Sequence, residues 1–337
     1  MNRNSGIVII AIAVIALFVL GAWFFTSLTP AYSGNPESIT VAYSPFESTA
    51  LLWVAEDRHF FEKNGLNLSL RKYDSGAASL DGVVNEEADM TVGVTEFPLV
   101  RKALQNVKVS AIGTVDKGDF TYLVARKDRG IVNVSDLKGK RIGTTIGTIA
   151  EFHLGRFLTL NGMTMRDITL VDVKTPDGWV NEVVNGNIDG ISTSQPYADA
   201  ARDRLGDNAV MWSVQGRQPL FALVVSTDVW IAGHPGTVRK FLNSLADAEE
   251  FINSHPAEAR AIIQRRLNFS DTYMPSVWQQ NQFSLTLEQS LVSAMEDEAR
   301  WMIENNLTNA TVVPDFGKSI YTDGLETVKP GSVNIIR

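Results

Sequence analysis

A polar loop at residues 144–148, Thr-Thr-Ile-Gly-Thr, carries groups suited to hold a small polar or anionic ligand. It follows a short strand that we predict over 140–143 and precedes an amphipathic helix predicted over 148–161. Such a loop leaves backbone N–H groups without partners at a helix N-terminus, where the helix carries partial positive charge. A plain strand-to-helix turn capped by Thr148 produces the same pattern, so this loop alone does not separate the two interpretations.

Two further loops of this kind follow predicted strands in the first part of the chain. Residues 74–79, Asp-Ser-Gly-Ala-Ala-Ser, lead into a helix that Asp74 or Ser75 is suited to cap. Residues 94–98, Val-Thr-Glu-Phe-Pro, form the second loop. Ligands in open α/β sheets sit beyond the carboxyl ends of the strands, so Glu96 is expected near the ligand. The exposed first turn of a helix, where a carboxylate suits the helix dipole, explains Glu96 equally well.

Composition narrows the classes of function. The 337 residues suffice for two domains, and the net charge of −8 without a basic cluster argues against a nucleic-acid partner. The absence of cysteine excludes disulfides, thiolate nucleophiles, cysteine-based metal sites and a lipid-modified cysteine anchor. No Gly-x-Ser-x-Gly, His-Glu-x-x-His or phosphate-loop motif occurs, and none of the four histidines falls in a predicted ligand loop. We therefore predict no catalytic residue, metal ligand or cofactor, and no enzymatic activity.

The N-terminal region contains one long apolar run. Residues 7–25 are uncharged and just long enough to cross a bilayer as a helix. The positive charges before the run favour a cytoplasmic tip at residues 1–6, with the rest of the chain outside. A cleaved signal peptide is the alternative, which would make the protein secreted or periplasmic, but its apolar core is usually shorter. We therefore predict an uncleaved signal anchor, followed by a flexible linker at 26–38.

Several motifs resemble one known family. Asp136–Gly143, D-L-K-G-K-R-I-G, is similar to the DLKGKKVA-type signature of substrate-binding proteins of ABC importers, in the nitrate/sulfonate/taurine and NMT1/THI5-like group. Val183–Ile191 resembles that family's L-x-x-G-x-I-D-A junction, and Ala55–Leu66 resembles its opening A-x-x-x-G-x-F-x-x-x-G-L. The resemblance runs from about Ile39 to Arg217 and is looser afterwards.

The resemblance implies an α/β periplasmic-binding-protein type II fold with two Rossmann-like lobes. Lobe 1 would span 39–123 and lobe 2 would span 124–218, with 219–337 returning to lobe 1 and ending in helices. Apolar strands at 120–125 and 220–226 would be the two hinge crossings. Together with the apolar run, the full prediction is this fold plus an N-terminal transmembrane helix.

The resemblance also implies a ligand site between the lobes. The residues carried over from it and from the loops above are Tyr43, Ser44, Pro45, Phe46, Ser75, Gly76, Ala77, Thr95, Glu96, Thr145, Ile146, Gly147, Thr148, Ser194 and Gln195. Many family members carry a Trp and an acidic residue before the Pro-Tyr pair that follows Gln195, whereas this chain has Ser194 and Gln195. A hydroxyl and an amide at this place suit hydrogen bonding to an anion or amide.

The predicted function is that of an extracytoplasmic solute-binding component of an ABC importer, with a small-molecule solute, the permease and the membrane as partners. A small oxyanion or sulfonate is the expected solute, held by neutral donors because no Arg or Lys falls in the predicted loops. Glu96, if it faces the cleft, would suit the ammonium group of taurine and disfavour bare nitrate. A membrane-tethered receptor and an enzyme related to pyrimidine-precursor synthesis are the alternatives. The cysteine-rich motif of that synthase relative cannot be present in a chain without cysteine.

Overall fold

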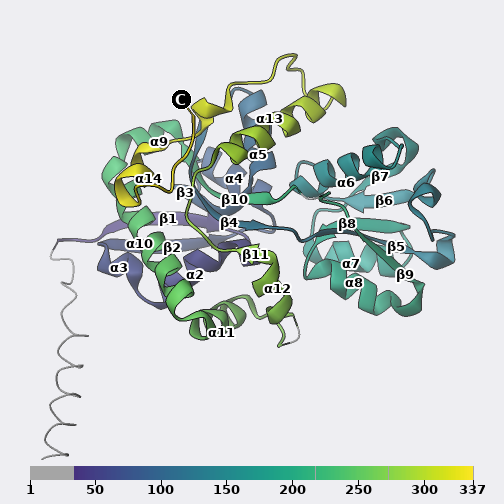
Figure 1. Cartoon of the computed structure of the whole chain (residues 1–337), viewed down its shortest axis with the longest axis horizontal. Helices are drawn as coiled ribbons and strands as arrows, with labels where there is room; N and C mark the ends of the chain where they lie inside the picture. The colour runs from purple at the N-terminus through teal and green to yellow at the C-terminus, as the bar shows by residue number, and fades with distance from the viewer. Residues whose placement is uncertain (1–33, 217, 272, 337) are drawn as a thin grey trace, which may run out of the picture.

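The computed structural model describes residues 34–216, 218–271 and 273–336, and they form two α/β lobes (Figure 1). The predicted tip, the anchor at 7–25 and most of the linker lie outside these residues. Within the described ranges, no helix is long and apolar enough to span a bilayer. The predicted two-lobed α/β class is confirmed by two separate sheets.

The elements divide between the lobes as follows. Lobe 1 contains β1 Glu37–Tyr43, η1 Glu47–Thr49, α2 Ala50–Asp57, α3 Phe60–Lys63, β2 Leu66–Lys72, α4 Gly76–Val84, β3 Met90–Thr95, α5 Glu96–Leu104, β4 Val109–Gly118, β10 Leu220–Thr227, α9 Asp228–Gly233, α10 Pro235–Ser254, α11 Pro256–Leu267, α12 Met274–Gln280, β11 Asn281–Gln282, α13 Gln289–Glu304 and α14 Asp323–Val328. Lobe 2 contains β5 Thr121–Arg126, β6 Arg141–Thr144, α6 Ile149–Leu160, β7 Thr169–Asp172, α7 Pro176–Val184, β8 Gly190–Ser194, α8 Tyr197–Leu205 and β9 Ala209–Ser213.

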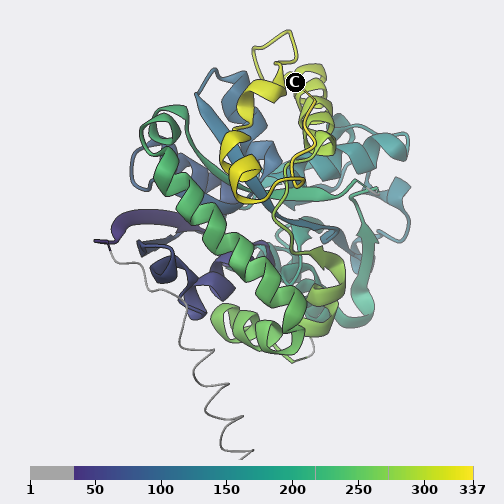
Figure 2. The ribbon, with the colours of Figure 1, turned by 60° about the vertical axis from the view of Figure 1, so that its left-hand side comes forward.

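The sheet of lobe 1 has the order β11-β4-β10-β3-β1-β2. Strands β1, β2 and β3 are parallel, while β10 runs antiparallel between β3 and β4. Residues 220–226 of β10 are all buried, which fits an apolar strand with both faces covered. The long helix α10 crosses one face of this lobe (Figure 2), and Phe241 and Leu245 belong to its buried stripe. A strand from late in the chain therefore completes the centre of the first sheet.

The sheet of lobe 2 has the order β7-β6-β8-β5-β9. Strand β5 pairs antiparallel with β8 and β9, so it lies wholly in lobe 2 and does not straddle the lobes as predicted. The chain leaves lobe 1 at residues 119–120, slightly before the predicted boundary at 123, and returns through 214–219. The apolar pattern of 120–125 predicted a strand correctly, but a short apolar run does not tell which sheet the strand joins.

Two helical predictions need correction. The apolar residues of 50–64 predict a single helix that ends before Gly65. The structure divides it into α2 and α3 at His59, which has a left-handed backbone conformation with φ of 59°. The break turns Phe61 onto Phe241 of α10, with ring centroids 5.2 Å apart. The apolar spacing from Leu285 to Trp301 predicts a long helix, and in the structure this helix, α13, begins only at Gln289.

The two connections between the lobes are fastened together by the side chain of Gln215. Its Oε1 accepts hydrogen bonds from the backbone N–H of Phe120 at 2.7 Å and of Thr121 at 2.9 Å. Its Nε2 donates to the carbonyls of Gly118 at 2.9 Å and Gln218 at 3.0 Å. The side chain is fully buried. The side-chain amide therefore uses all of its donors and acceptors on backbone groups of the two crossing segments. We call these four hydrogen bonds the Gln215 clasp.

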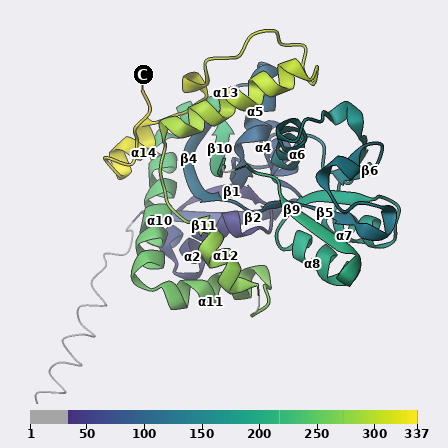
Figure 3. The same cartoon turned by 45° about the vertical axis from the view of Figure 1, so that its right-hand side comes forward.

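A second contact between the lobes is aromatic. Phe97 of α5 stacks on Phe152 of α6 with centroids 5.9 Å apart, and Trp301 of α13 meets the Phe152 ring edge-on at 5.5 Å. Figure 3 shows α13 lying along α5 and close to α6. Gly155 lets the indole approach α6, since a Cβ atom there would lie 2.2 Å from Cζ2 of Trp301. Helix α13 of lobe 1 therefore packs against α6 of lobe 2.

Gly155→Ala should lower the free energy of unfolding by about 1–3 kcal/mol, because the added methyl group must displace the Trp301 indole. Urea unfolding of the full-length chain measures it. Gly236→Ala is the matched control, since it also adds a methyl group to a helix but meets no atom within 4 Å. We expect that variant to be unchanged or stabilised by up to about 1 kcal/mol. Equal effects of the two variants would contradict the close contact at Gly155.

Candidate functional site

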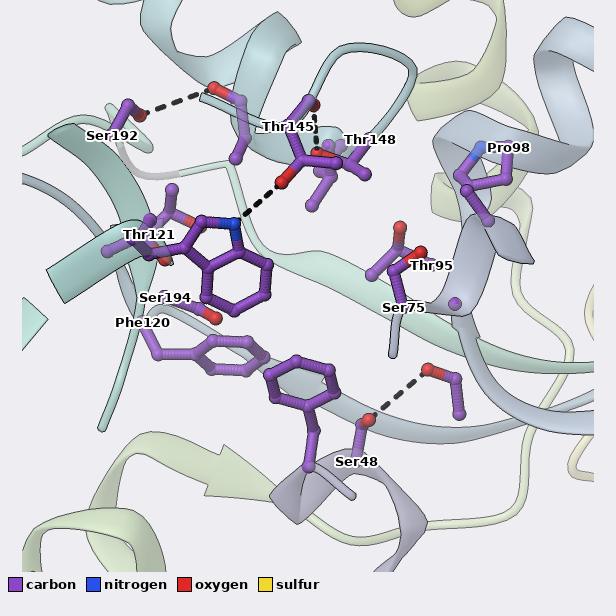
Figure 4. Close-up of a pocket in the computed structure, with 18 residues that line it drawn as sticks. Ser48, Ser75, Thr95, Pro98, Phe120, Thr121, Thr145, Thr148, Ser192 and Ser194 are labelled. Atoms are coloured by element: carbon purple, nitrogen blue, oxygen red, sulfur yellow. Dashed lines mark hydrogen bonds between the residues drawn. The ribbon is translucent and has the colours of Figure 1, made fainter. Parts of the chain in front are cut away.

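A pocket lies between the two lobes and encloses about 670 Å³ of empty space, open solvent at its mouth included. Its lining residues come from both lobes: Phe46, Ser48, Ser75, Gly76, Ala77, Gly93, Thr95, Pro98, Phe120, Thr121, Thr145, Thr148, Ile149, Ala150, Trp179, Ser192, Thr193 and Ser194. Figure 4 shows Ser75, Thr95 and Pro98 of lobe 1 facing Thr121 and Ser194 of lobe 2. Every residue in this described lining is uncharged, so any ligand held here would meet hydroxyls, backbone groups and rings.

Two helix N-termini reach the pocket from opposite lobes. Helix α4 is capped by Ser75, whose hydroxyl oxygen accepts from the N–H of Ala78. The N–H groups of Gly76 and Ala77 lie in the first turn and have no carbonyl partner inside their helix. Helix α6 presents Ile149 and Ala150 in the same way behind Thr148. Both ends carry partial positive charge, which suits an anionic or strongly polar acceptor.

Several hydroxyls of the lining are committed to the protein. Thr145 donates to the carbonyl of Val173 at 2.7 Å and accepts from Nε1 of Trp179 at 2.9 Å. Thr148 donates to the carbonyl of Thr145 at 2.7 Å, which tightens the loop before α6. Ser48 donates to the carbonyl of Gly93 at 3.2 Å. These side chains shape the pocket and have no hydrogen left to donate to a ligand.

Other hydroxyls keep their hydrogens available. Ser75 acts only as an acceptor toward Ala78, so its own O–H is free to turn to a ligand. Among the described residues, Thr95 and Ser194 have no hydrogen-bond partner for their side chains, and both line the pocket. Donors are therefore present on both walls.

An aromatic wall closes one side of the pocket. Phe46 of lobe 1 lies over Trp179 of lobe 2 with ring centroids 6.2 Å apart and an interplanar angle of 23°. Tyr197 meets Trp179 edge-on at 4.9 Å. Phe120 adds a further ring to the lining. These rings offer an apolar surface beside the polar donors.

Eight of the predicted site residues line this pocket: Phe46, Ser75, Gly76, Ala77, Thr95, Thr145, Thr148 and Ser194. Whether they bind a ligand stays a prediction.

The other predicted residues lie elsewhere. Tyr43 packs edge-on against Trp53, and Ser44 is buried. Pro45 lines a separate depression on the surface, and Ile146 is exposed.

Two more predicted residues turn away from the pocket. Gly147 lies beside it, where Arg101 of α5 packs so closely that a Cβ atom would be 1.7 Å from Nη1. Its N–H donates to Glu151 at 2.7 Å, so this donor is not free for a ligand. Gln195 is buried, and its Oε1 accepts from the N–H of Asp199 at the start of α8.

The prediction that Glu96 faces the cleft is wrong. Its carboxyl group is 1% exposed and accepts from the N–H of Phe221 at 3.1 Å. It interacts with the buried carboxyl group of Glu298 on α13, and burial raises the pKa of both carboxyl groups. Thr95 and Glu96 are neighbours at a strand end, and Thr95 takes the pocket side. Glu96 therefore supplies no charge to a ligand.

The remaining lining residues are outside the predicted set of site residues: Ser48, Gly93, Pro98, Phe120, Thr121, Ile149, Ala150, Trp179, Ser192 and Thr193. Some carried a signal, since Ser192-Thr193-Ser194 is a run of hydroxyls at the carboxyl end of β8. Trp179 is both a packed aromatic and part of the lining, because it is 6% exposed and borders the pocket.

Buried carboxyl groups lie behind the lining in lobe 1. Glu47 follows Phe46 in sequence but is fully buried, with Oε1 3.4 Å from the hydroxyl of Tyr273. Burial raises the pKa of Glu47 to about 7. Burial and the neighbouring Glu47 raise the pKa of Asp116 on β4 well above its ordinary value. Both carboxyl groups lie within the fold and do not line the pocket.

Comparison with known proteins identifies a family and several relatives of this sequence. A sequence model of the family described as NMT1/THI5 like matches residues 47–259. The chain is 26% identical to the taurine-binding periplasmic protein of Escherichia coli, over 67% of this chain and 70% of that protein. It is 25% identical to the 4-amino-5-hydroxymethyl-2-methylpyrimidine phosphate synthase of Aspergillus parasiticus, over 62% of this chain. The chain matches 64% of the length of that synthase and 60% of its relative from Schizosaccharomyces pombe.

Solved structures share the architecture. The alkanesulfonate-binding protein SsuA from Xanthomonas axonopodis pv. citri, bound to MOPS, superposes with a TM-score of 0.74. The identity is 16%, and the match covers 86% of this chain and 100% of that one. The aliphatic sulphonate binding protein SsuA of Escherichia coli gives a TM-score of 0.69 at 16% identity, with 85% of this chain and 98% of that one covered. The likeness confirms the predicted periplasmic-binding-protein fold.

Proposed function

The chain belongs to the NMT1/THI5-like family, and from this premise we propose that it is an extracytoplasmic solute-binding component of an ABC importer. The proposed solute is a small sulfonate or related oxyanion, captured in the pocket between the lobes. The permease would be its protein partner. The apolar run at 7–25 supports export and, by its length, anchoring in the membrane.

The observation that carries the proposal is the pair of helix N-termini, α4 and α6, that meet at one uncharged pocket from opposite lobes. Neutral donors arranged in this way suit an oxyanion whose charge is spread over several oxygens. The ring of Phe46 over Trp179 suits an organic tail, which favours a sulfonate over bare nitrate. With Glu96 turned into the core, no carboxylate in the lining favours taurine over an unsubstituted alkanesulfonate.

The likeness to pyrimidine phosphate synthases supports a second candidate, an enzyme or binding protein for a pyrimidine precursor. The aromatic wall could stack against a pyrimidine ring. Against this candidate, the described lining contains only neutral side chains, whereas acid-base chemistry needs a positioned titratable group.

A thermal-shift screen of the full-length chain tests the proposal. The solutes are ethanesulfonate, taurine, nitrate, bicarbonate and 4-amino-5-hydroxymethyl-2-methylpyrimidine. We expect the largest rise in melting temperature with ethanesulfonate, because a ligand at one hundred times its Kd adds about 2.7 kcal/mol of stability. Ala77→Leu should abolish the shift by filling the pocket, while Ala200→Leu on the exposed face of α8 should keep it. A shift with the pyrimidine alone would support the second candidate and overturn the first.

A further inference from the structure

One buried histidine touches the pocket through a lining hydroxyl. His153 of α6 is 1% exposed, and its Nδ1 lies 3.2 Å from Oγ1 of Thr121. Thr121 begins β5, is 1% exposed and lines the pocket. Its backbone N–H is held by the Gln215 clasp, and its carbonyl accepts from Val214. Thr121 is therefore fixed in place, and the remaining variable is the direction of its hydroxyl hydrogen.

The charge and the tautomer of the His153 ring determine where the Thr121 hydroxyl hydrogen points. Burial and the neighbouring Arg156 lower the pKa of His153 to about 3, so the ring is neutral at physiological pH. A neutral imidazole has one N–H donor and one bare nitrogen acceptor. Nε2 is buried and has no partner among the described residues. A hydrogen on Nε2 would bury an unsatisfied donor, whereas a hydrogen on Nδ1 has Thr121 Oγ1 as its acceptor.

We propose that His153 is a positioning residue that donates from Nδ1 to Thr121 and thereby keeps the Thr121 hydroxyl as a donor to the ligand. The ligand must then present an acceptor oxygen at this wall, rather than an ammonium or hydroxyl hydrogen. This inference rests on the proposed function, because it names the ligand atom that the same pocket selects. The opposite tautomer would make Thr121 an acceptor only and would select a donor such as an amine.

The surroundings of Thr121 agree with an acceptor oxygen. Ser194 is its cross-strand partner in the β5–β8 register, lines the pocket, and has no side-chain hydrogen bond within the described structure. The first-turn N–H groups of Ile149 and Ala150 at the start of α6 also line this side. Ser192 on the same strand donates to the carbonyl of Ala150 at 3.3 Å. Two hydroxyls and a helix N-terminus therefore converge on one wall as donors.

The tautomer can be observed without a ligand. Nitrogen-15 NMR of the full-length chain, labelled at histidine and assigned by comparison with the His153→Asn spectrum, separates the two neutral tautomers by their ring-nitrogen shifts. We expect the Nδ1–H form, unchanged from pH 8 down to pH 5. The Nε2–H form, or a charged ring at neutral pH, would overturn the inference whether or not the chain binds a sulfonate.

The second arm measures binding of ethanesulfonate by calorimetry. We expect Thr121→Val to weaken binding about tenfold, because it removes the hydroxyl that donates to the ligand. His153→Leu should also weaken binding, because nothing then directs that hydroxyl hydrogen toward the ligand. The double variant should bind no more weakly than Thr121→Val, because His153 acts only through that hydroxyl. Thr121→Ser, which keeps the hydroxyl, and His153→Asn, whose amide N–H can take the place of Nδ1, should bind within about threefold of the parent. Additive losses, or equal losses in His153→Asn and His153→Leu, would overturn the positioning role.

The experiments distinguish a failure of the proposed solute-binding function from a failure of the role proposed for His153. If the parent chain binds no member of the sulfonate panel, the proposed function fails, and the tautomer still decides the role of His153. If His153→Leu does not fold, the pair Thr121→Val and Thr121→Ser together with the tautomer gives the answer. Circular dichroism of each variant identifies that case.

Discussion

Gln215→Met is expected to lower the free energy of unfolding by about 3–5 kcal/mol, one of the two largest effects that the structure predicts. Methionine has nearly the same length but leaves the N–H groups of Phe120 and Thr121 and the carbonyl of Gly118 without their partner. Each buried backbone group that loses its hydrogen bond costs about 1–3 kcal/mol. Denaturant unfolding of the full-length chain measures the loss.

Two control variants separate the clasp from a general effect of substitution. Gln215→Glu keeps an acceptor for the two N–H groups but faces the carbonyls of Gly118 and Gln218 with a second acceptor, so its loss should be smaller at acidic pH, where the carboxyl can donate. Gln282→Met changes an exposed glutamine and should leave stability within about 0.5 kcal/mol. Hydrogen exchange at Phe120 and Thr121 should accelerate only in the Gln215 variants. Unchanged hydrogen exchange and unchanged stability in Gln215→Met would mean that the Gln215 clasp does not stabilise the connections between the lobes.

Stability is expected to fall by several kcal/mol as the pH rises from about 5 to 8, which is opposite to the behaviour of a protein whose acids are paired with cations. Burial raises the pKa of several carboxyl groups, among them the fully buried Glu47, Glu96, Asp116 and Glu298. Between the ordinary and the raised pKa, the folded chain binds protons that the unfolded chain has lost, so stability decreases with pH. For Glu47, a rise from 4.5 to about 7 corresponds to roughly 3 kcal/mol.

Melting temperature against pH measures this slope. Glu298→Gln removes one of the two interacting carboxyl groups and leaves an amide that can donate to Glu96, so its slope should be shallower than that of the parent. Glu304→Gln, an exposed change on the same helix, should keep the parent slope. A melting temperature that is flat or rises between pH 5 and 8 would mean that these carboxyl groups are not held as protonated acids.

The predicted loops reach the pocket, but only some of their residues line it, for one physical reason. The carboxyl ends of strands are where the sequence predicts a pocket, and Ser75, Thr95, Thr148 and Ser194 line the observed one. Successive residues of an extended segment point to opposite sides, and sequence alone does not say which side is the cleft. Ser194 therefore lines the pocket while the next residue, Gln195, is buried against α8.

The rest of the site depends on contacts between residues far apart in the chain. Nε1 of Trp179 meets the hydroxyl of Thr145, which lies 34 positions earlier. Gln215 reaches Phe120 across 95 positions, and nothing in its local sequence marks it. The sequence predicts no role for His153, because a single histidine on a helix forms no pattern. Only the packing of α6 against β5 reveals its hydrogen bond to Thr121.

The placement of β10 has a consequence for the order in which the molecule is made. Lobe 2 is one continuous stretch from Thr121 to Ser213, so all of its strands have been synthesised before the ribosome reaches Leu220. The sheet of lobe 1 lacks its central strand until that point, and β3 and β4 have no common partner while they wait. Unpaired strand edges are sites of aggregation. The lobe that begins first along the chain is therefore completed last, and the nascent protein must protect an open sheet while its second lobe is already whole.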